Sequence, residues 1–312
     1  MDNAGSDAPA TKNQRREATR EKAKELRDAQ RKREKRNRVF LQGGIAVAVL
    51  GIIAAVVFII TSAIRPPAPG PENMASDGIV IGEELKAVRT PALAAGADPI
   101  PTAIDANVPN IRIYVDYLCP LCGQFEETNT EQLGTWADNG TATVEYHPIA
   151  ILTGRSAGSQ YSLRAANAAA CVANDAPDKF FAFNSLMFED QPEEGTEGHS
   201  DDQLKKIVAK ALQTDAGTAP AGPAQNAIES CIADGTFKTW VQSTTDRATT
   251  EAVPNSSLDK VKGTPTVLVN DKQYAGSITD AKEFQAFVLS VASETYAKSS
   301  PTPTPTPSAP AE

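Results

Sequence analysis

Histidine and cysteine are scarce in this chain of 312 residues, which contains two histidines and four cysteines. A structural zinc site needs four ligands, usually supplied by Cys and His at short, repeated spacings. One such pair is present, Cys119 and Cys122, and it has no second pair to complete it. The remaining candidate ligands are scattered along the sequence: His147, Cys171, His199 and Cys231. We therefore expect no metal site.

Positive charge is scarce outside the N-terminal segment. Residues 1–38 carry 13 Lys and Arg against 7 Asp and Glu, whereas residues 65–312 carry 17 against 32. Phosphates repel a surface of this sign, so the acidic part of the chain is unsuited to nucleic-acid binding. We expect no nucleic-acid partner, and we assign the basic segment to a membrane flank.

Charge is absent from residues 39–64, which predicts a transmembrane helix. At about 1.5 Å per residue this run spans roughly 39 Å, more than the roughly 30 Å of a bilayer's hydrocarbon core. Basic residues crowd its N-terminal flank, so the positive-inside rule places residues 1–38 in the cytoplasm and everything after Arg65 outside the cell membrane. A cleaved signal peptide is the alternative, but such peptides usually have a shorter head and a shorter apolar stretch.

Proline-rich segments flank the remaining sequence. Residues 65–77 contain the run Pro66-Pro-Ala-Pro-Gly-Pro71, which disfavours helix and predicts an extended linker. Residues 299–312 contain an alternating Pro-Thr run, residues 301–307, and are predicted to be a disordered tail. The sequence between them, residues 78–298, is long enough for one large domain.

The most informative motif of this domain is Cys119-Pro120-Leu121-Cys122. It follows a predicted strand, Ile111–Val115, and begins a predicted helix that runs to Asp138. With Cys119 at the N-cap, Pro120 falls at the first helical position, where its missing N–H is no loss. Free backbone N–H groups and the helix dipole then stabilise a Cys119 thiolate, while Cys122 lies one turn deeper. The order of strand, cysteine pair and helix indicates a redox-active dithiol.

Two other uses of this cysteine pair are open from the sequence. The two sulfurs could form a purely structural disulfide. Alternatively, a cysteine could act as a papain-like nucleophile with His147 as its base, which leaves the second cysteine without a role.

A second motif lies near the C-terminal end of the domain. Thr264-Pro265 directly precedes the β-branched run Thr266–Val269, and a proline can open a strand where its missing donor is tolerated. Residues 273–274 can pair back on this strand, and a capped amphipathic helix is predicted from Asp280 onward.

Together these motifs resemble a known family. The segment Tyr114-Val-Asp-Tyr-Leu-Cys-Pro-Leu-Cys122, followed by Phe125-Glu126, and the segment Gly263-Thr-Pro-Thr266 are similar to the DsbA-like branch of the thioredoxin superfamily. The charged head and single span resemble its membrane-anchored actinobacterial members. The resemblance implies an α/β thioredoxin-like fold with a helical insertion, at about residues 153–252, preceded by one transmembrane helix.

The resemblance also implies roles for single residues. Cys119 corresponds to the exposed nucleophilic cysteine and Cys122 to the resolving cysteine. Pro265 corresponds to a cis-proline, and its neighbour Thr264 to the residue that pairs with substrate backbone. Asp116 is a candidate proton acceptor for Cys122, or alternatively a turn cap.

The dipeptide between the cysteines, Pro120-Leu121, is expected to tune the redox potential. Many strongly oxidising members carry histidine or another polar residue at the position of Leu121. Because leucine donates no hydrogen bond to the thiolate, we expect a weaker oxidant. Cys171 and Cys231 both fall in the helical insertion, and an even pair of cysteines facing an oxidising compartment is most simply a structural disulfide.

These features predict a single-pass thiol–disulfide oxidoreductase whose catalytic domain lies outside the cell membrane. Its substrates would be exported cysteine-containing proteins, into which it introduces disulfides, and no cofactor is expected. Reoxidation would need a membrane quinone-linked partner, DsbB-like or VKOR-like. Two alternatives stay open: a reductase or isomerase that receives electrons across the membrane, and a non-catalytic thioredoxin-fold module that binds peptides.

Overall fold

The computed structural model describes residues 69–213 and 222–299, together with residues 24, 27 and 31–33. The chain divides into two compact units, residues 1–65 and 66–312. Within the part of the chain that the structure describes, no helix is both long and apolar enough to cross a membrane. The predicted span, residues 39–64, lies outside the described residues, as does the predicted tail after Ser299.

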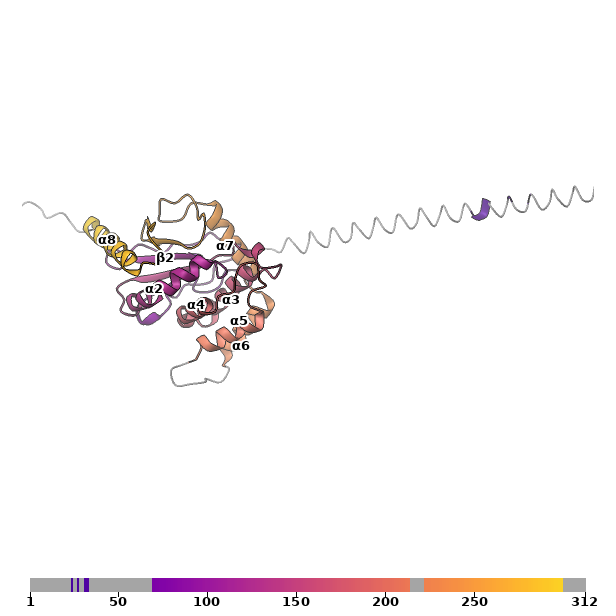
Figure 1. Ribbon diagram of the computed structural model, residues 1–312, viewed down its shortest axis with the longest axis horizontal. Coiled ribbons are helices and arrows are strands. Elements are labelled where there is room, and N and C mark those ends of the chain that lie inside the picture. Colours follow the sequence, from indigo (N-terminus) through magenta and orange to yellow (C-terminus); the bar gives the residue numbers. More distant parts are fainter. Residues whose placement is uncertain (1–23, 25–26, 28–30, 34–68, 214–221, 300–312) are drawn as a thin grey trace, which may run out of the picture. The chain divides into compact units, whose positions relative to one another are not determined.

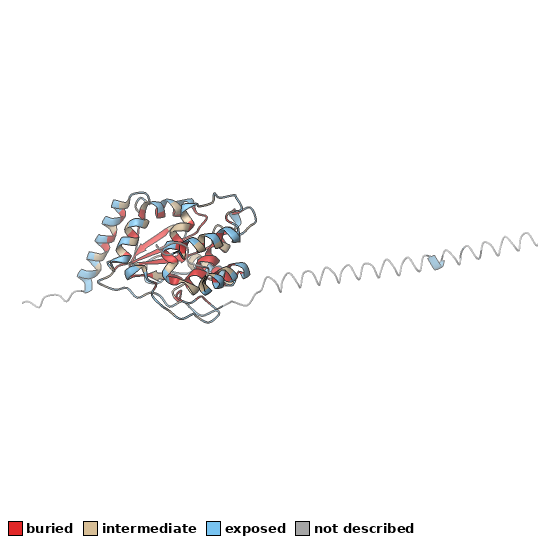
Figure 2. Cartoon of the chain, turned by 90° about the horizontal axis from the view of Figure 1, so that it is seen from below, coloured by how far each residue is buried: buried red, intermediate tan, exposed pale blue. Residues whose placement is uncertain are grey.

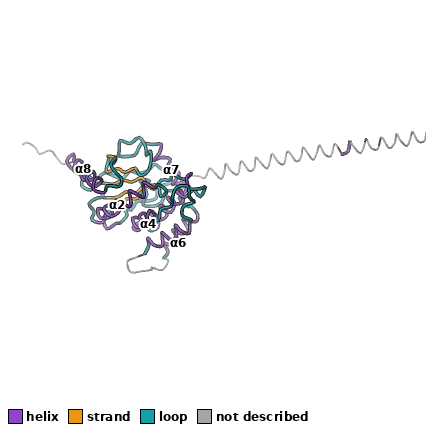
Figure 3. The backbone as a smooth tube through the Cα atoms, viewed as in Figure 1, coloured by secondary structure: helices purple, strands orange, loops and turns teal. Residues whose placement is uncertain are grey.

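A five-stranded mixed sheet forms the centre of the second unit (Figure 3), with strand order β1-β3-β2-β4-β5. The two central strands, β2 and β3, run parallel, and all other neighbours pair antiparallel. The parallel pair is buried except for Thr143 at the start of β3, which suits strands covered on both faces. The strand bounds are β1 (Ile79–Ile81), β2 (Asn110–Val115), β3 (Thr143–Pro148), β4 (Thr266–Val269) and β5 (Lys272–Gln273).

The two faces of the sheet differ because successive side chains of a strand point to opposite sides. Ile111, Ile113 and Val115 of β2 belong to the main hydrophobic core, together with aromatic residues of α2 (Pro120–Asp138) and α8 (Ala281–Ser299). Figure 1 shows α2 and α8 beside the sheet. The buried strands and the solvent-facing outer sides of these helices are seen in Figure 2. Burial of one helical stripe therefore fixes α2, and with it the cysteine motif, against the sheet.

Helices fill the chain between β3 and β4, as the predicted insertion at residues 153–252 requires. Most of α3 is buried, and its alanines allow neighbouring helices to approach closely. The bounds of the five α-helices are α3 (Tyr161–Asp175), α4 (Phe180–Glu189), α5 (Asp201–Ala211), α6 (Pro223–Asp234) and α7 (Lys238–Thr250). Short 3-10 helices are η1 (Glu83–Leu85), η2 (Thr153–Arg155) and η3 (Pro177–Lys179).

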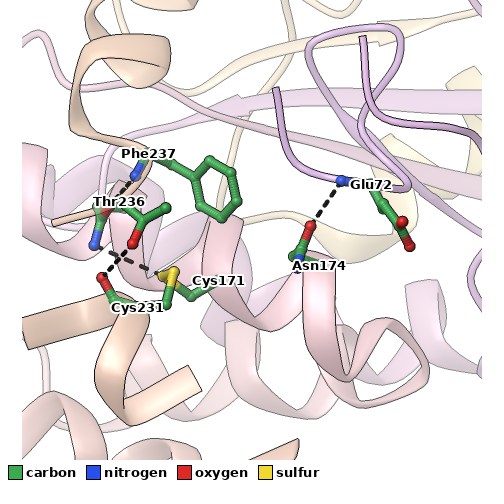
Figure 4. The surroundings of a disulfide bond; sticks show 7 residues. Glu72, Cys171, Asn174, Cys231, Thr236 and Phe237 are labelled. Carbon is green, nitrogen blue, oxygen red and sulfur yellow. Dashed lines mark hydrogen bonds between the residues drawn. A yellow bond between two sulfur atoms is a disulfide. The ribbon is translucent and has the colours of Figure 1, made fainter. Parts of the chain in front are cut away.

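A disulfide joins two of the insertion helices (Figure 4). Cys171 of α3 is bonded to Cys231 of α6, with Cα atoms 5.9 Å apart, within the normal range for a disulfide. Beside it, the Asn167 side chain accepts a hydrogen bond from the Phe237 backbone N–H at 2.8 Å. The bond therefore ties together helices that are 60 residues apart in sequence.

The sequence predicts an extended linker at residues 65–77, but the second half of this segment packs against the domain. Gly70, Asn73 and Met74 are buried. The Glu72 backbone N–H donates to Asn174 Oδ1 at 3.0 Å (Figure 4), and the Asn73 amide donates to a carbonyl of α3. Residues 72–73 form a turn rather than an extended segment, and the polar groups of this half pair with the domain. The packed domain thus begins at about Gly70 rather than at residue 78.

Strand β3 was not predicted, because its central residues are charged or polar. Glu145 is 1% exposed and accepts hydrogen bonds from Ser76 and Thr102, while His147 and Arg112 lie beside its carboxylate. Burial alone would raise the pKa of Glu145, but these two neighbours outweigh burial and lower it to about 2. Through Ser76 and Thr102, this network ties the chain that precedes β2 to the face of the sheet that carries Arg112 and Glu145.

Candidate active site

The cysteine motif lies at the carboxyl end of β2, where the chain turns into α2. The helix begins at Pro120 with Cys119 as its N-cap, as predicted. The turn is closed by the Cys119 N–H, which donates to the Asp116 carbonyl at 2.9 Å. In the first helical turn, the N–H groups of Cys122 and Gly123 both point to the Cys119 carbonyl, at 3.0 and 3.3 Å.

The two cysteines are free thiols that differ in accessibility and acidity. Cys119 is 7% exposed and Cys122 is fully buried. The expected order of exposure is found, but Cys119 is far less exposed than predicted, because the loop before β4 packs over it. Its Sγ lies 3.1 Å from the Thr264 carbonyl oxygen.

Local hydrogen bonds make Cys119 the more acidic thiol. A hydrogen bond from the Cys122 thiol, with further bonds from the Thr264 side chain and from the backbone N–H groups of Cys122 and Leu121, lowers the pKa of Cys119 to about 6 against the opposing effect of burial. Burial, together with the neighbouring Cys119, raises the pKa of Cys122 well above its ordinary value. Near neutral pH, Cys119 is therefore the nucleophilic thiolate and Cys122 is protonated.

Asp116 is buried beneath the motif. Its Oδ1 accepts from the Leu118 N–H and its Oδ2 from the Leu152 N–H, both at 2.9 Å. Burial raises the pKa of Asp116 to about 6, and the charge of Cys119 adds to this rise, whereas the two N–H bonds oppose it. A carboxyl with such a pKa can both accept and release a proton near neutral pH.

The second predicted motif lies directly beside the first. The Thr264–Pro265 peptide bond is cis. Thr266, the first residue of β4, pairs with Tyr114 of β2, so the sheet register carries the loop to the end of β2 that holds the dithiol. Two segments about 145 residues apart thus meet at Cys119 Sγ and the Thr264 carbonyl.

Exposed apolar surface borders this sulfur. Leu121, between the cysteines, is 49% exposed. Neither its side chain nor that of Pro120 can donate a hydrogen bond. The thiolate is therefore stabilised by the backbone, Cys122 and Thr264 rather than by the intervening dipeptide's side chains.

The histidines lie in other hydrogen-bond networks. His147 is bonded to Glu145 at 3.1 Å and His199 to the Asp190 carbonyl at 2.8 Å, so neither is placed as a base for Cys119. Over residues 69–213 and 222–299, no group of three or more His, Cys, Asp and Glu residues could hold a metal ion. The papain-like alternative needs His147 beside Cys119, and the hydrogen bond that the structure gives this histidine is to Glu145.

One contact of the site was missed by sequence analysis. The Gln191 amide, from the loop after α4, donates to the carbonyls of Tyr117 and Cys119 at 3.1 and 2.9 Å. Gln191 lies more than 70 residues from both partners and belongs to a polar loop, so no local pattern in the sequence indicates this contact.

Comparisons with known proteins agree with this architecture. A family model described as thioredoxin matches residues 105–289, more than half of the chain. The serine/threonine-protein kinase PknE of Mycobacterium tuberculosis (strain H37Rv) is 31% identical over 143 residues, 45% of this chain and 22% of the kinase. The chain thus spans less than a quarter of the length of the curated relatives that it matches.

Solved structures similar to this chain include three bacterial thiol–disulfide proteins. The reduced disulfide bond oxidoreductase DsbG of M. tuberculosis is 25% identical, with 62% of this chain and 86% of that chain covered and a TM-score of 0.45. Reduced DsbA of the same species is 24% identical over 72% and 100% of the two chains, with a TM-score of 0.48. Oxidised BdbD of Bacillus subtilis is 17% identical over 73% and 100%, with a TM-score of 0.48.

The thioredoxin match extends over both motifs, from before β2 to within α8. The five helices between β3 and β4 form the insertion that the sequence predicts for a DsbA-like protein. The chain therefore belongs to the thioredoxin family.

Proposed function

We propose that this protein is a membrane-anchored, extracytoplasmic thiol–disulfide oxidoreductase that introduces disulfides into exported proteins. The observation that carries the proposal is the pairing of a low-pKa thiol, Cys119, with a buried high-pKa thiol, Cys122, beside the Thr264–Pro265 loop. A structural thiol pair gains nothing from such a difference in acidity, whereas thiol–disulfide exchange depends on it.

In the proposed reaction, the oxidised enzyme carries a Cys119–Cys122 disulfide. A substrate thiolate attacks Cys119 Sγ, forming a mixed disulfide as the bond to Cys122 breaks and its sulfur leaves with the electron pair. A second substrate thiolate then attacks the substrate sulfur of the mixed disulfide, and Cys119 leaves as a thiolate. The substrate ends with one disulfide, and its two electrons reside in the reduced dithiol.

Each step uses a property of the site. The departing Cys122 sulfur needs a proton because burial disfavours its charged form, and we assign the proton transfer to Asp116. Cys119 leaves easily in the second step because its thiolate is stabilised. We assign to Thr264 and Pro265 the task of holding the substrate backbone beside Cys119, in support of which the Thr264 carbonyl lies 3.1 Å from its sulfur.

The acidity of Cys119 supports the proposed direction of electron flow. Stabilising the thiolate stabilises the reduced enzyme, which makes the disulfide form a stronger oxidant. A pKa of about 6 supports an oxidase even though Leu121 contributes no hydrogen bond. The proposed cycle closes when a membrane quinone-linked partner, DsbB-like or VKOR-like, reoxidises the dithiol.

The redox state of the dithiol in growing cells tests this proposal. Cells are quenched in acid, free thiols are labelled with a mass-shifting maleimide, and the chain is detected on a gel. An oxidase rests mainly as the Cys119–Cys122 disulfide, whereas a reductase or isomerase rests as the dithiol. The Cys122→Ala variant should in addition accumulate mixed disulfides with exported proteins, since Cys119 stays reactive without its resolving partner.

The matched control for the trapping experiment is Cys119→Ala. Because Cys122 is fully buried, this variant should trap nothing. If the Cys122→Ala variant also traps nothing, and the purified chain neither oxidises nor reduces a dithiol peptide, the peptide-binding alternative replaces the enzyme.

A further inference from the structure

The loop between α4 and α5, residues 190–200, is held against the domain at several points. His199 is bonded to the Asp190 carbonyl at 2.8 Å, which closes the loop on itself. The Gly195 N–H donates to the Arg155 carbonyl at 2.7 Å, which attaches the loop to η2. The backbone that carries Gln191 is therefore fixed independently of the cysteine motif.

From this loop the side chain of Gln191 reaches the turn before α2. Both hydrogens of its terminal amide are used, one for the Tyr117 carbonyl at 3.1 Å and one for the Cys119 carbonyl at 2.9 Å. The Cys119 carbonyl also accepts the N–H groups of Cys122 and Gly123. One side chain of the insertion thus holds the Tyr117–Leu118 and Cys119–Pro120 peptide groups, the second of which opens the first turn of α2.

A glycine in α2 makes room for this amide. A Cβ atom at Gly123 would lie 2.3 Å from Gln191 Oε1, closer than nonbonded atoms approach. Glycine inside a helix is otherwise unfavourable relative to alanine. The close approach of the Gln191 amide therefore explains why this position of α2 is a glycine.

The backbone that Gln191 holds leads into the first turn of α2, whose N–H groups stabilise the Cys119 thiolate. The groups that face Cys119 are the Asp116 carboxyl at the end of β2, the Cys122 thiol of α2 and Thr264 of the loop before β4. The N–H groups of Leu121 and Cys122 complete this set, and their direction depends on the peptide planes of the first helical turn. Because Gln191 is uncharged, its effect on the Cys119 sulfur comes only from the way it orients these peptide planes.

We propose that Gln191 is a positioning residue of the dithiol, which aims the first-turn N–H groups of α2 at Cys119 and so links the helical insertion to the reactive sulfur. The proposal rests on the proposed function only in taking Cys119 as the reactive thiol. The same contact gives the insertion a part in setting the acidity of Cys119, because movement of the loop at residues 190–200 would move the Cys119 carbonyl.

The test measures the rate of Cys119 alkylation against pH in the reduced full chain. Gln191→Ala removes both hydrogen bonds and should raise the pKa of Cys119 by about half a unit, the equivalent of one modest hydrogen bond. Gln191→Glu should raise it further, because a carboxylate cannot donate and repels both carbonyls. Gln124→Ala and Gln124→Glu, at an exposed position of α2 in the same cleft, make the same chemical changes and should leave the pKa unchanged.

Gly123→Ala tests the contact from the other side. The new methyl group should displace the flexible Gln191 amide and raise the pKa of Cys119, although alanine by itself favours helix. In the Gln191→Ala background the methyl group meets no amide, so adding Gly123→Ala should cause no further rise. This non-additivity identifies the contact itself as the cause.

An unchanged Cys119 pKa in Gln191→Ala, Gln191→Glu and Gly123→Ala overturns the proposal, and a lowered melting temperature alone would then mark Gln191 as a purely structural contact. The alkylation assay does not depend on substrate or on the direction of electron flow. A chain that fails to oxidise substrates but shows the predicted pKa shifts therefore contradicts the proposed function and leaves the role of Gln191 intact.

Discussion

Cys119 and Cys122 are separated by two residues, yet their environments drive their pKa values in opposite directions. Cys119 at the N-cap faces N–H groups and a neighbouring thiol, while Cys122 has no solvent contact. From the order of strand, cysteine pair and helix, with Pro120 at the first helical position, the sequence predicted the stabilised Cys119 thiolate and the deeper position of Cys122. It could not predict Gln191, because a hydrogen bond between distant residues leaves no periodic pattern.

The role of Asp116 can be tested by Asp116→Asn. When the enzyme oxidises a substrate, the departing Cys122 sulfur takes up a proton, and the protonated Asp116 that can supply it is lost as the pH rises through about 6, so this step should slow over that range. Asp116→Asn has no such titration, so the variant should lose this pH dependence, and the steps that involve Cys122 should slow at least tenfold. Single-turnover oxidation of a dithiol peptide, followed against pH, measures the effect.

Alkylation of Cys119 provides the control for Asp116→Asn. Removing a nearby negative charge favours the thiolate, so the pKa of Cys119 should fall and alkylation at low pH should be as fast or faster. If the exchange rate keeps its native pH profile, Asp116 only caps the turn through its bond to the Leu118 N–H.

Leu121 offers a direct means of changing the redox potential. Because this side chain is 49% exposed, Leu121→His needs no repacking of the core. A histidine beside the thiolate should lower the pKa of Cys119 by about one unit, equivalent to about 30 mV toward a more oxidising potential. Equilibration with glutathione buffers measures the potential, and Leu121→Ala, which adds no donor, should stay near the native value. Equal potentials in all three proteins would contradict the prediction.

Among the elements, those with a clear pattern were predicted and those stabilised by distant partners were not. The structure confirms the strand at Ile111–Val115, the strand at Thr266–Val269 and the helix that begins after Cys119. Within the predicted insertion, α3 begins only at Tyr161, because Ala157, Gly158 and Gln160 adopt positive φ and form a turn before it. Strand β3 was missed because Glu145 is compensated by Arg112 and His147, a feature that only the sheet register creates.

The disulfide between α3 and α6 should stabilise the insertion without taking part in exchange. Cross-linking cysteines 60 residues apart reduces the entropy of the unfolded chain and contributes up to about 4 kcal/mol. The double variant Cys171→Ser with Cys231→Ser should therefore unfold at a lower urea concentration and melt at a lower temperature. It should retain dithiol exchange at a temperature where it is folded.

The same double variant can also contradict the prediction that the Cys171–Cys231 disulfide stabilises the insertion and takes no part in exchange. Unchanged stability would mean that packing of α3 against α6 already fixes these helices. Loss of exchange in a variant that circular dichroism shows to be folded would mean that Cys171 and Cys231 contribute to the reaction.

At the scale of the whole molecule, the uneven distribution of charge along the chain predicts on which side of the membrane the domain lies. The described domain belongs to an acidic part of the chain, while the basic residues precede the uncharged run at residues 39–64. A structural disulfide is typical of compartments outside the reducing cytoplasm, and the proposed oxidation of substrates by a Cys119–Cys122 disulfide would require such a compartment. The location predicted by the positive-inside rule and the chemistry of the domain therefore agree.

Protease protection tests this topology directly. Protease added to intact spheroplasts should degrade the domain that follows Arg65 and spare an epitope tag placed within residues 1–38, because the bilayer shields the cytoplasmic side. After permeabilisation with detergent, the tag should be lost as well. Protection of the domain in intact spheroplasts, with the tag degraded, would place Cys119 and Cys122 in a reducing compartment. The dithiol would then rest reduced, and introduction of disulfides into exported proteins would no longer be possible.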